Sequence, residues 1–559
     1  MKKMFKWAGL SLISGAMLML AACGGGTAAE PETAQPAQPP TQQETTGETT
    51  TPPATEDPAE RERTTLTVLT WDRGGPGAVD AADNYFTRWI QEQVLEELNI
   101  EVEFVAIGRW SEGDDIVNLM AAGMAPDLAM TWNGGMVQTF GRQGGIMNLG
   151  PLLEENLANL PDLEEWLDDM LWVNQDPLDG SIFSIMQRRA HVPRTGTFIR
   201  ADWLDTLGIP VPTTHEEFLD ALRAFRDNAD VLGVSTMVPL AMTNDVRWRA
   251  STLLESFIDP NLSQEELFIH FVGDRHILLP GYVDGVRMLN QMFHEGLIDP
   301  DFAFHDGDEF SDNMVVAGQV GAYIHNWDNL WRANPDIKNR LLELDPDARF
   351  IPIDPFPNPV SGLTQKITYE VHGFHIFIPT TSQNPVGALE YLNWMSRVEN
   401  RLFLQVGEEG YHHDIAMVGG YEVPIMIEFD TEGPRRMYSP QNIDLTLVVN
   451  GIDLGSQDAN AASMSLAFPG IDPQLVADSY NIALYHGFQM PVVTVPGGLP
   501  HNDQFAPTFQ ELVSQLLAQA IVADPADFDA VWEAGMQGML NAGAQQAMDE
   551  RRAGLSAVE

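Results

Sequence analysis

The sequence predicts an α/β protein with mainly parallel sheets, because runs typical of strands alternate with runs typical of helices. The runs Thr64–Thr70, Ile100–Ile107 and Leu128–Thr131 are rich in β-branched and apolar residues, and helical patterns lie between them. The chain has 559 residues, of which 44% are hydrophobic. A chain of this length and composition can bury a large core, and we expect it to divide into two or more structural units.

Residues 1–22 predict a signal peptide. Lysines at positions 2, 3 and 6 are followed by the mostly apolar run Trp7–Ala22. That run is shorter than the roughly 20 residues of a membrane span, and it ends in small residues. Leu20–Cys23 resembles the lipobox of bacterial lipoproteins, which implies that Cys23 carries a lipid and becomes the new N-terminus. The alternative is a plain secretory peptide in which this cysteine is incidental.

The segment 23–63 predicts a disordered linker between the lipid anchor and the folded chain. It is rich in Thr, Pro, Gln, Glu and Ala and has almost no large apolar residues, so it cannot bury enough surface to fold. Cys23 is the only cysteine of the chain. The sequence therefore excludes an intrachain disulfide and a thiolate zinc site.

The charge balance is strongly acidic. Asp and Glu total 80 against 30 Lys and Arg, which gives a formal net charge of -50. Such a surface repels nucleic acid and anionic lipid headgroups, so we expect no nucleic-acid partner. It is typical of a protein that works outside the cytoplasm in saline or alkaline surroundings, although an ordinary acidic secreted protein fits equally well.

The stretch Ile199–Phe225 predicts two helices joined by a fixed turn. Gly208 follows the last turn of the first helix, where glycine adopts a left-handed backbone most easily. Thr214 and Glu217 have the spacing of a capping box at the start of the second helix. Phe218, Leu222 and Phe225 then recur at the spacing of one buried helix face.

The order of residues in this stretch closely resembles the start of the second lobe in family 1 extracellular solute-binding proteins. Members of that family feed ABC importers, many of them for oligosaccharides. The residues that carry the resemblance are Arg200, Asp202, Trp203, Leu204, Gly208, Pro210, Pro212, Thr213 and Glu217. Gly123–Asp127, Asp179–Phe183 and Gly407–Tyr411 also resemble turns of the family. Met186–Arg189 departs from it, since members often have a proline there.

The resemblance implies a two-lobed, periplasmic-binding-protein-like fold of type II, with the ligand in a cleft between the lobes. Each lobe would be a mainly parallel sheet flanked by helices. We expect lobe 1 to comprise residues 64–186 and 371–430, and lobe 2 to comprise 187–370 and 431–559. The implied partners are an oligosaccharide and the permease subunits of an ABC importer. We further expect a monomer without a cofactor, held by its lipid on the extracytoplasmic face of the cell membrane.

Sugars offer flat apolar ring faces and many hydroxyls, so their sites need aromatic side chains and planar polar groups. In open α/β sheets, ligands bind beyond the carboxyl ends of the strands. The candidates are tryptophans just past strand ends or at the crossovers between the lobes, together with polar neighbours. They are Trp71, Asp72, Trp132, Asn133, Asn244, Arg247, Trp248, Trp327 and Asp328. The alternative for each tryptophan is core packing, to which we assign Trp203, Trp394 and Trp532.

Arginines cluster at the expected first crossover, among them Arg188, Arg189 and Arg194, and two more flank Trp248. An arginine fork matches a carboxylate in a bidentate way. Arg188 and Arg247 are therefore candidates for binding a uronate-type sugar. The alternative is that these arginines pair with the many acidic side chains nearby.

The sequence shows no nucleophile elbow, P-loop, Rossmann fingerprint or His-Glu-x-x-His motif. His412-His413 could bind a metal, but adjacent histidines on a loop are usually just polar residues. Carboxylate pairs such as Glu164-Glu165 and Asp168-Asp169 arise by chance in so acidic a chain. We therefore expect no enzyme and no metal. A lipid-anchored glycoside hydrolase and an oligopeptide-binding receptor remain open as alternatives.

Overall fold

The computed structural model describes residues 61–558, except 76, 168–169, 177, 306, 333–335, 354, 469–470, 486, 494 and 496–497. The expected signal peptide, the lipidation site Cys23 and nearly all of the expected linker lie outside the described residues, as does the pair Asp168-Asp169. In the part of the chain that the structure describes, no helix is long and apolar enough to cross a membrane.

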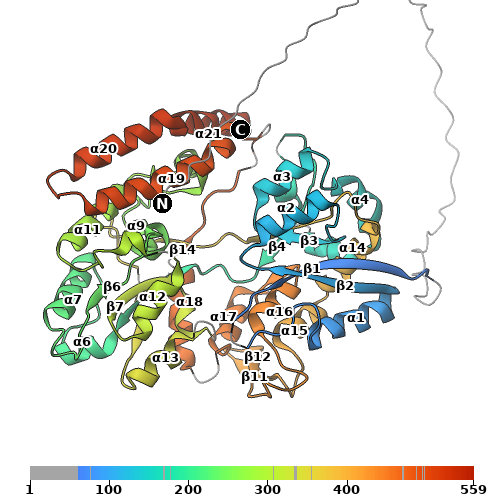
Figure 1. The fold of residues 1–559 in the computed structure, drawn as a ribbon, viewed down its shortest axis with the longest axis horizontal. Coiled ribbons are helices and arrows are strands. Elements are labelled where there is room, and N and C mark those ends of the chain that lie inside the picture. The colour runs from blue at the N-terminus through green and yellow to red at the C-terminus, as the bar shows by residue number, and fades with distance from the viewer. Residues whose placement is uncertain are drawn as a thin grey trace, which may run out of the picture. The chain divides into compact units, whose positions relative to one another are not determined.

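Lobe 1 has one hydrophobic core, built from buried residues between 66 and 190 and between 374 and 449. It contains the first strands and helices and a later segment that returns to them (Figure 1). Its elements are β1 (Thr64–Asp72), α1 (Tyr85–Leu98), β2 (Ile100–Gly108), α2 (Glu112–Ala122), β3 (Ala129–Thr131), α3 (Gly134–Arg142), α4 (Leu149–Asn156), α5 (Pro161–Leu167), β4 (Ile185–Arg189), β10 (His372–Phe377), α14 (Pro385–Ser396), α15 (Val398–Val406), β11 (His413–Val418), β12 (Tyr421–Met426), α16 (Ser439–Leu445) and β13 (Val449–Asn450).

Lobe 2 has two hydrophobic clusters, drawn from residues 198–367 and 476–548. The first part of its chain provides β5 (Thr195–Arg200), α6 (Ala201–Leu207), α7 (His215–Asp227), β6 (Val238–Leu240), α8 (Val246–Arg249), α9 (Ser251–Ser256), α10 (Gln264–His270), α11 (Tyr282–His294), α12 (Asp308–Val316), β7 (Val320–Asn326), α13 (Ile337–Leu344), β8 (Phe350–Ile353) and β9 (Lys366–Ile367). The C-terminal part adds α17 (Gln457–Ser465), α18 (Pro473–Tyr485), β14 (Gly487–Phe488), α19 (Pro500–Val522), α20 (Phe528–Met539) and α21 (Gln545–Val558).

The α/β class and the two-lobed fold are confirmed, but the sheets are mixed rather than mainly parallel. β13 with β4, β6 with β7 and β14 with β9 pair in parallel. β1 and β2 pair in parallel, and Val68 bridges Leu128 in parallel just before β3. β10 is antiparallel to both β3 and β4, and β5 is antiparallel to both β7 and β8. The reason is the crossovers: β4 leaves lobe 1, whereas β10 enters it, so the two run in opposite directions.

The helix pair of Ile199–Phe225 is confirmed. Gly208 ends α6 with a φ of 67°, and the hydroxyl of Thr214 accepts a hydrogen bond from the Glu217 amide at 3.3 Å. The Glu217 carboxylate accepts from the amide of Thr213 at 2.8 Å, so the capping box closes one residue earlier than its spacing predicts. Phe218 and Phe225 are fully buried. These local signals fix the first elements of lobe 2.

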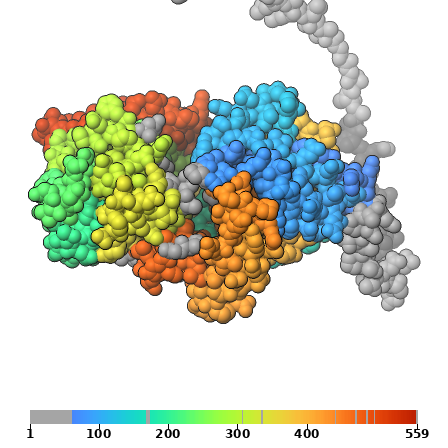
Figure 2. Space-filling view, turned by 60° about the horizontal axis from the view of Figure 1, so that its bottom comes forward, coloured from blue at the N-terminus to red at the C-terminus, as the bar shows by residue number. Residues whose placement is uncertain are grey.

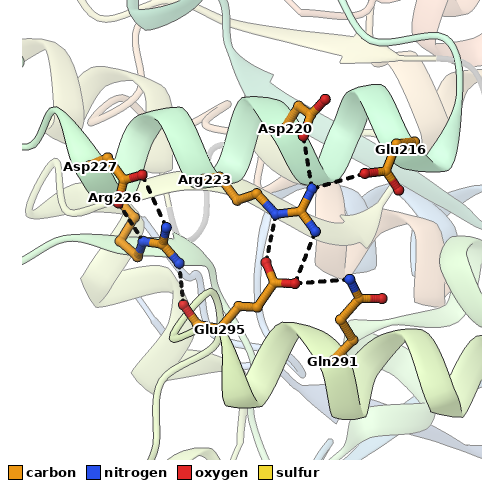
Figure 3. A network of polar contacts seen from close by, with 7 residues as sticks. All are labelled: Glu216, Asp220, Arg223, Arg226, Asp227, Gln291 and Glu295. Atoms are coloured by element: carbon orange, nitrogen blue, oxygen red, sulfur yellow. Dashed lines mark hydrogen bonds and ion pairs between the residues drawn. The ribbon is translucent and has the colours of Figure 1, made fainter.

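A network of ion pairs and hydrogen bonds joins α7 to the end of α11 (Figure 3). Arg223 on α7 donates to both carboxylate oxygens of Glu295, which follows α11, at 2.6 and 2.9 Å. It also donates to Glu216 and Asp220 on its own helix. The hydrogen bond to Arg223 lowers the pKa of the Glu295 carboxyl. The network is largely exposed, so its contribution to stability is modest.

The division of the chain into lobes at residues 186, 370 and 430 stays a prediction. Met437 and Leu445–Val449 pack in the core of lobe 1, which favours a last boundary nearer Asn450.

Figure 2 shows a hollow between the yellow surface of α12 and α13 and the blue surface of the first strands and helices. The predicted core tryptophans Trp203, Trp394 and Trp532 are buried, as expected.

Candidate ligand-binding site

Three strand ends of lobe 1 bring an arginine and three indoles together. β1 and β2 run in parallel, and β3 continues from a parallel bridge to β1, so their carboxyl ends lie at the same edge. The guanidinium carbon of Arg109, just after β2, lies 4.5 Å from the ring centre of Trp71. It lies 5.8 Å from Trp132 and 5.2 Å from Trp110. The edge of the sheet is thus lined by aromatic rings around a cation.

The crossovers between the lobes continue this arrangement. Arg189, the last residue of β4, places its guanidinium carbon 5.3 Å from the Trp132 ring and 4.3 Å from the Tyr369 ring. Tyr369 belongs to the returning crossover, and its amide donates to the carbonyl of Val192 at 2.8 Å. The outgoing and returning crossovers therefore lie side by side, with Arg189 and Tyr369 between the two lobes.

Lobe 2 completes the arrangement. The Trp248 and Tyr369 rings are 6.4 Å apart, and the guanidinium carbon of Arg194 lies 4.8 Å from the Trp248 ring. Arg194 in turn donates to Glu255 at 2.5 Å. We call the continuous set from lobe 1 to lobe 2 the arginine–aromatic row. It consists of Trp71, Arg109, Trp132, Arg189, Tyr369, Trp248 and Arg194.

Burial and crowding of positive charge affect the arginines of this region. Burial lowers the pKa of the Arg109 and Arg189 guanidiniums. Burial and the charge of Arg247 lower the pKa of Arg275 to about 10. Burial and three nearby arginines lower the pKa of His276 well below its usual range, so this ring is neutral. The region thus contains several arginines that are buried close to one another.

The structure distributes the predicted site residues over different environments. Trp132, Arg247 and Trp248 are partly exposed, and both tryptophans lie in the row. Trp71 and Trp327 are 0% and 6% exposed and belong to the cores, so neither can stack directly on a ligand. The buried Trp71 ring instead contacts the guanidinium of Arg109. We therefore leave these two tryptophans out of the proposed contact set.

The polar candidates mainly hold local structure. Asp72 accepts from the amide of Gly74 at 2.9 Å, and Asn133 caps α3 by accepting from Met136 at 2.9 Å. Asp328 pairs with Arg332 at 2.7 Å. Asn244 is exposed, and its backbone N–H donates to the backbone carbonyl of His305 at 2.9 Å. Arg188 packs on Trp166 at 4.8 Å and donates to its carbonyl, whereas its neighbour Arg189 joins the row.

Sequence reasoning missed Arg109, Trp110, Tyr369 and the specific role of Arg189. The signal for the first two was present, because Gly108-Arg109-Trp110 follows a predicted strand end just as Trp71 and Trp132 do. Trp110 is 78% exposed, which is unusual for an indole and suits a surface on which a sugar ring could stack. Tyr369 carried no signal, because its place depends on the return of the chain from lobe 2.

His412-His413 is a structural pair. The Nδ1 atom of His412 accepts from the Glu408 amide at 2.9 Å, and its Nε2 bonds to the Arg435 carbonyl at 2.6 Å. His413 bonds to the Val406 carbonyl at 3.2 Å. Among the described residues, no group of three or more His, Cys, Asp and Glu side chains could hold a metal ion.

A large cavity lies elsewhere, within lobe 2. It has a volume of about 1000 Å³ and opens between α7, α11 and the segment around Pro357–Pro359. His215, Phe257 and Arg287 are among its lining residues. None of the residues of the arginine–aromatic row lines it, so it is a separate feature of lobe 2.

Comparisons with known proteins agree with this fold. A family model described as bacterial extracellular solute-binding protein matches residues 79–401. Lipoprotein LipO of Bacillus subtilis (strain 168) is 24% identical over 334 residues, covering 56% of this chain and 62% of that protein. The polygalacturonan/rhamnogalacturonan-binding protein YtcQ of the same organism is 24% identical over 237 residues, covering 42% and 45%. The matches thus span less than two thirds of either relative.

Two solved structures extend the comparison over most of the chain. The alginate-binding protein AlgQ2 without calcium ion has a TM-score of 0.61 and 17% identity, and the match covers 89% of this chain and 98% of that one. An HMO-binding, ABC-transporter-associated solute-binding protein from Bifidobacterium longum infantis has a TM-score of 0.61 and 15% identity, covering 88% and 98%. At these identities the similarity establishes the two-lobed fold.

Proposed function

The chain belongs to the bacterial extracellular solute-binding protein family, and we propose that it is the receptor of an ABC importer, which captures an oligosaccharide between its lobes and delivers it to the permease. The observation that carries the proposal is the arginine–aromatic row, which runs from strand ends of lobe 1 across both crossovers to lobe 2. A ligand that contacts both lobes binds the closed form better and so favours closure.

The chemistry of the row supports a sugar ligand. Partly exposed indole and phenol rings suit the apolar faces of sugar rings, and arginine N–H groups suit their hydroxyls. The names of the relative YtcQ and of the structures AlgQ2 and the Bifidobacterium protein all refer to saccharides. An oligopeptide would require backbone partners for its amides, and the row offers mainly rings and cations. We therefore favour an oligosaccharide over an oligopeptide.

The experiment is calorimetric titration of the purified protein with panels of oligosaccharides and oligopeptides. We expect saturable binding of at least one oligosaccharide with a Kd near 1 μM or tighter, which is about -8 kcal/mol. Trp132→Ala should weaken this binding by at least about fivefold, since stacking on an aromatic ring contributes roughly 1 kcal/mol beyond its area. Binding of peptides without any binding of sugars would contradict the proposal.

A glycoside hydrolase is the second candidate, because two carboxylates close to the row have raised pKa values. Burial raises the pKa of Glu112, which accepts from the Trp132 amide at 2.9 Å. Burial likewise raises the pKa of Asp444, which pairs with Arg73 at 2.6 Å. Their side chains are only 11% and 1% exposed, so neither is placed to reach a glycosidic bond. Release of reducing ends from a bound oligosaccharide would favour the hydrolase.

We also propose that Cys23 carries the lipid and that residues 1–22 are removed, which holds the receptor on the extracytoplasmic face of the membrane. The support is the Leu20–Cys23 lipobox pattern and the relative that is named a lipoprotein. Cys23→Ser should move the protein from the membrane fraction to the soluble fraction on cell fractionation, because the thiol that accepts the lipid is gone. If the variant stays wholly with the membrane, the anchor lies elsewhere.

A further inference from the structure

Arginine side chains are concentrated around the arginine–aromatic row, although the chain is strongly acidic. Arginines gather on the row itself and beside its two ends. They are Arg73, Arg109, Arg189, Arg194, Arg247, Arg275 and Arg332. Carboxylates lie among these arginines as well, so attraction of an anion depends on which individual arginines lack a partner.

Some of these cations are already neutralised by the protein. Arg73 pairs with Asp444 at 2.6 Å, Arg194 with Glu255 at 2.5 Å, and Arg332 with Asp328 at 2.7 Å. Arg109 and Arg247 are compensated less well, because their nearest carboxylate oxygens, on Glu112 and Asp245, are 3.9 Å away. The positive charge that the protein does not compensate therefore lies on a few arginines, among them Arg109 and Arg247.

Arg189 is the least compensated cation of the row. No carboxylate among the described residues lies within ion-pair distance of it, and Glu370 acts on it only from further away. Its Nε atom is buried and has no hydrogen-bond partner in the described part of the chain. A cation that is desolvated without an anion costs free energy, which an incoming anion can recover.

The aromatic contacts of Arg189 do not supply oxygen acceptors for its N–H donors. The Trp132 and Tyr369 ring centres lie 5.3 and 4.3 Å from its central carbon, and its Nε has no hydrogen-bond partner in the described part of the chain. Five N–H donors in a fixed fork match the two oxygens of a carboxylate. Neutral hydroxyls could also accept these hydrogen bonds, but they would leave the charge uncompensated.

We propose that the ligand carries carboxylates of the uronic-acid type, and that Arg189 binds one of them while the neighbouring aromatic rings hold the sugar. This rests on the proposed function as an oligosaccharide receptor. Arg109, which shares the Trp132 ring with Arg189, and Arg247 at the lobe 2 end extend the positive surface along the ligand. Arg188, the adjacent residue of β4, packs on Trp166 instead and does not take part.

The test compares oligomers of galacturonate, mannuronate and guluronate with their methyl esters, which keep the sugar chain and remove the charge. Calorimetry on the full chain should show that at least one acid oligomer binds ten- to a hundredfold more tightly than its ester. This is the factor expected for one charged hydrogen-bonded contact. Arg189→Ala should remove most of that difference, whereas the matched variant Arg188→Ala should keep it.

The outcomes separate the two proposals. If the native protein binds an ester or a neutral oligosaccharide as tightly as the acid, the proposed receptor function is supported and the proposed carboxylate ligand is overturned. If it binds no saccharide of either kind, both are overturned. Equal losses in Arg188→Ala and Arg189→Ala would contradict the assignment to Arg189. Should Arg189→Ala fail to fold, the comparison of acid with ester on the native chain still decides the charge of the ligand.

Discussion

Replacing Glu255 with alanine should lower the free energy of unfolding by about 3–5 kcal/mol, which is the range for removing one partner of a buried ion pair. Glu255 is 2% exposed and accepts from Arg194 at 2.5 Å. It also accepts from the amide of Ile367 at 3.0 Å, on the returning crossover. The variant would leave the Arg194 cation buried without its anion and free one crossover amide.

Two controls make this expectation specific. The exposed pair of Arg287 and Asp529 has side chains that are 45% and 72% exposed, so Asp529→Ala should cost less than about 1 kcal/mol. The double variant Arg194→Met with Glu255→Leu should recover part of the loss, because no isolated charge remains. Urea unfolding of all three measures the free energies. If Glu255→Ala loses no more than Asp529→Ala, the pair does not anchor lobe 2.

The stability of the protein should fall as the pH drops from about 6.5 to about 4, because of buried histidines. Burial lowers the pKa of His191 and of His375 to about 4 in the folded protein. Unfolded histidine has a pKa near 6.5, so the unfolded chain binds the proton first. The stability linked to each ring is fully present above pH 6.5 and is lost on acidification. A difference of about 2.5 pKa units corresponds to about 3 kcal/mol for each ring.

A single variant isolates this effect from the titration of the many carboxylates. His375 lies at the strand pairing of β10, where its Nδ1 bonds to the Ser184 hydroxyl at 2.9 Å. His375→Gln cannot take up a proton, so its stability deficit against the native chain should shrink by about 2–3 kcal/mol between pH 7 and pH 4.5. Urea midpoints at both pH values give the deficit. A deficit in His375→Gln that stays constant between the two pH values would contradict the prediction.

The local elements of the fold were predictable from the sequence, whereas the direction of the strands was not. Gly208, Thr214 and the Phe218–Phe225 face carry their signals within a few residues, and the structure confirms each of them. The antiparallel course of β10 depends on a crossover that leaves lobe 1 after β4 and returns nearly 200 residues later. Residue spacing along the chain does not predict which strands the returning segment pairs with, or in which direction.

The candidate site was predictable in kind but not in detail. The positions of Trp71 and Trp132 just past strand ends predicted that both line the site. Their burial depends on tertiary packing, which buries Trp71 and leaves Trp132 partly exposed. Arg188 and Arg189 are chemically identical and adjacent, and successive residues of a strand point to opposite faces. The sequence did not show which of the two faces the row, because Trp166 and Tyr369 come from distant segments.

The exposure of Trp110 has a spectroscopic consequence. Most tryptophans whose side chains the structure describes are buried or half-buried, whereas the Trp110 indole is 78% in water beside Arg109. Indole fluorescence shifts to longer wavelength in a polar, relaxing solvent, so the red edge of the emission reports chiefly on this one ring. A molecule that settles over it would displace water and shift that edge toward the blue. The emission of the native chain therefore reports, without any attached dye, whether Trp110 is covered.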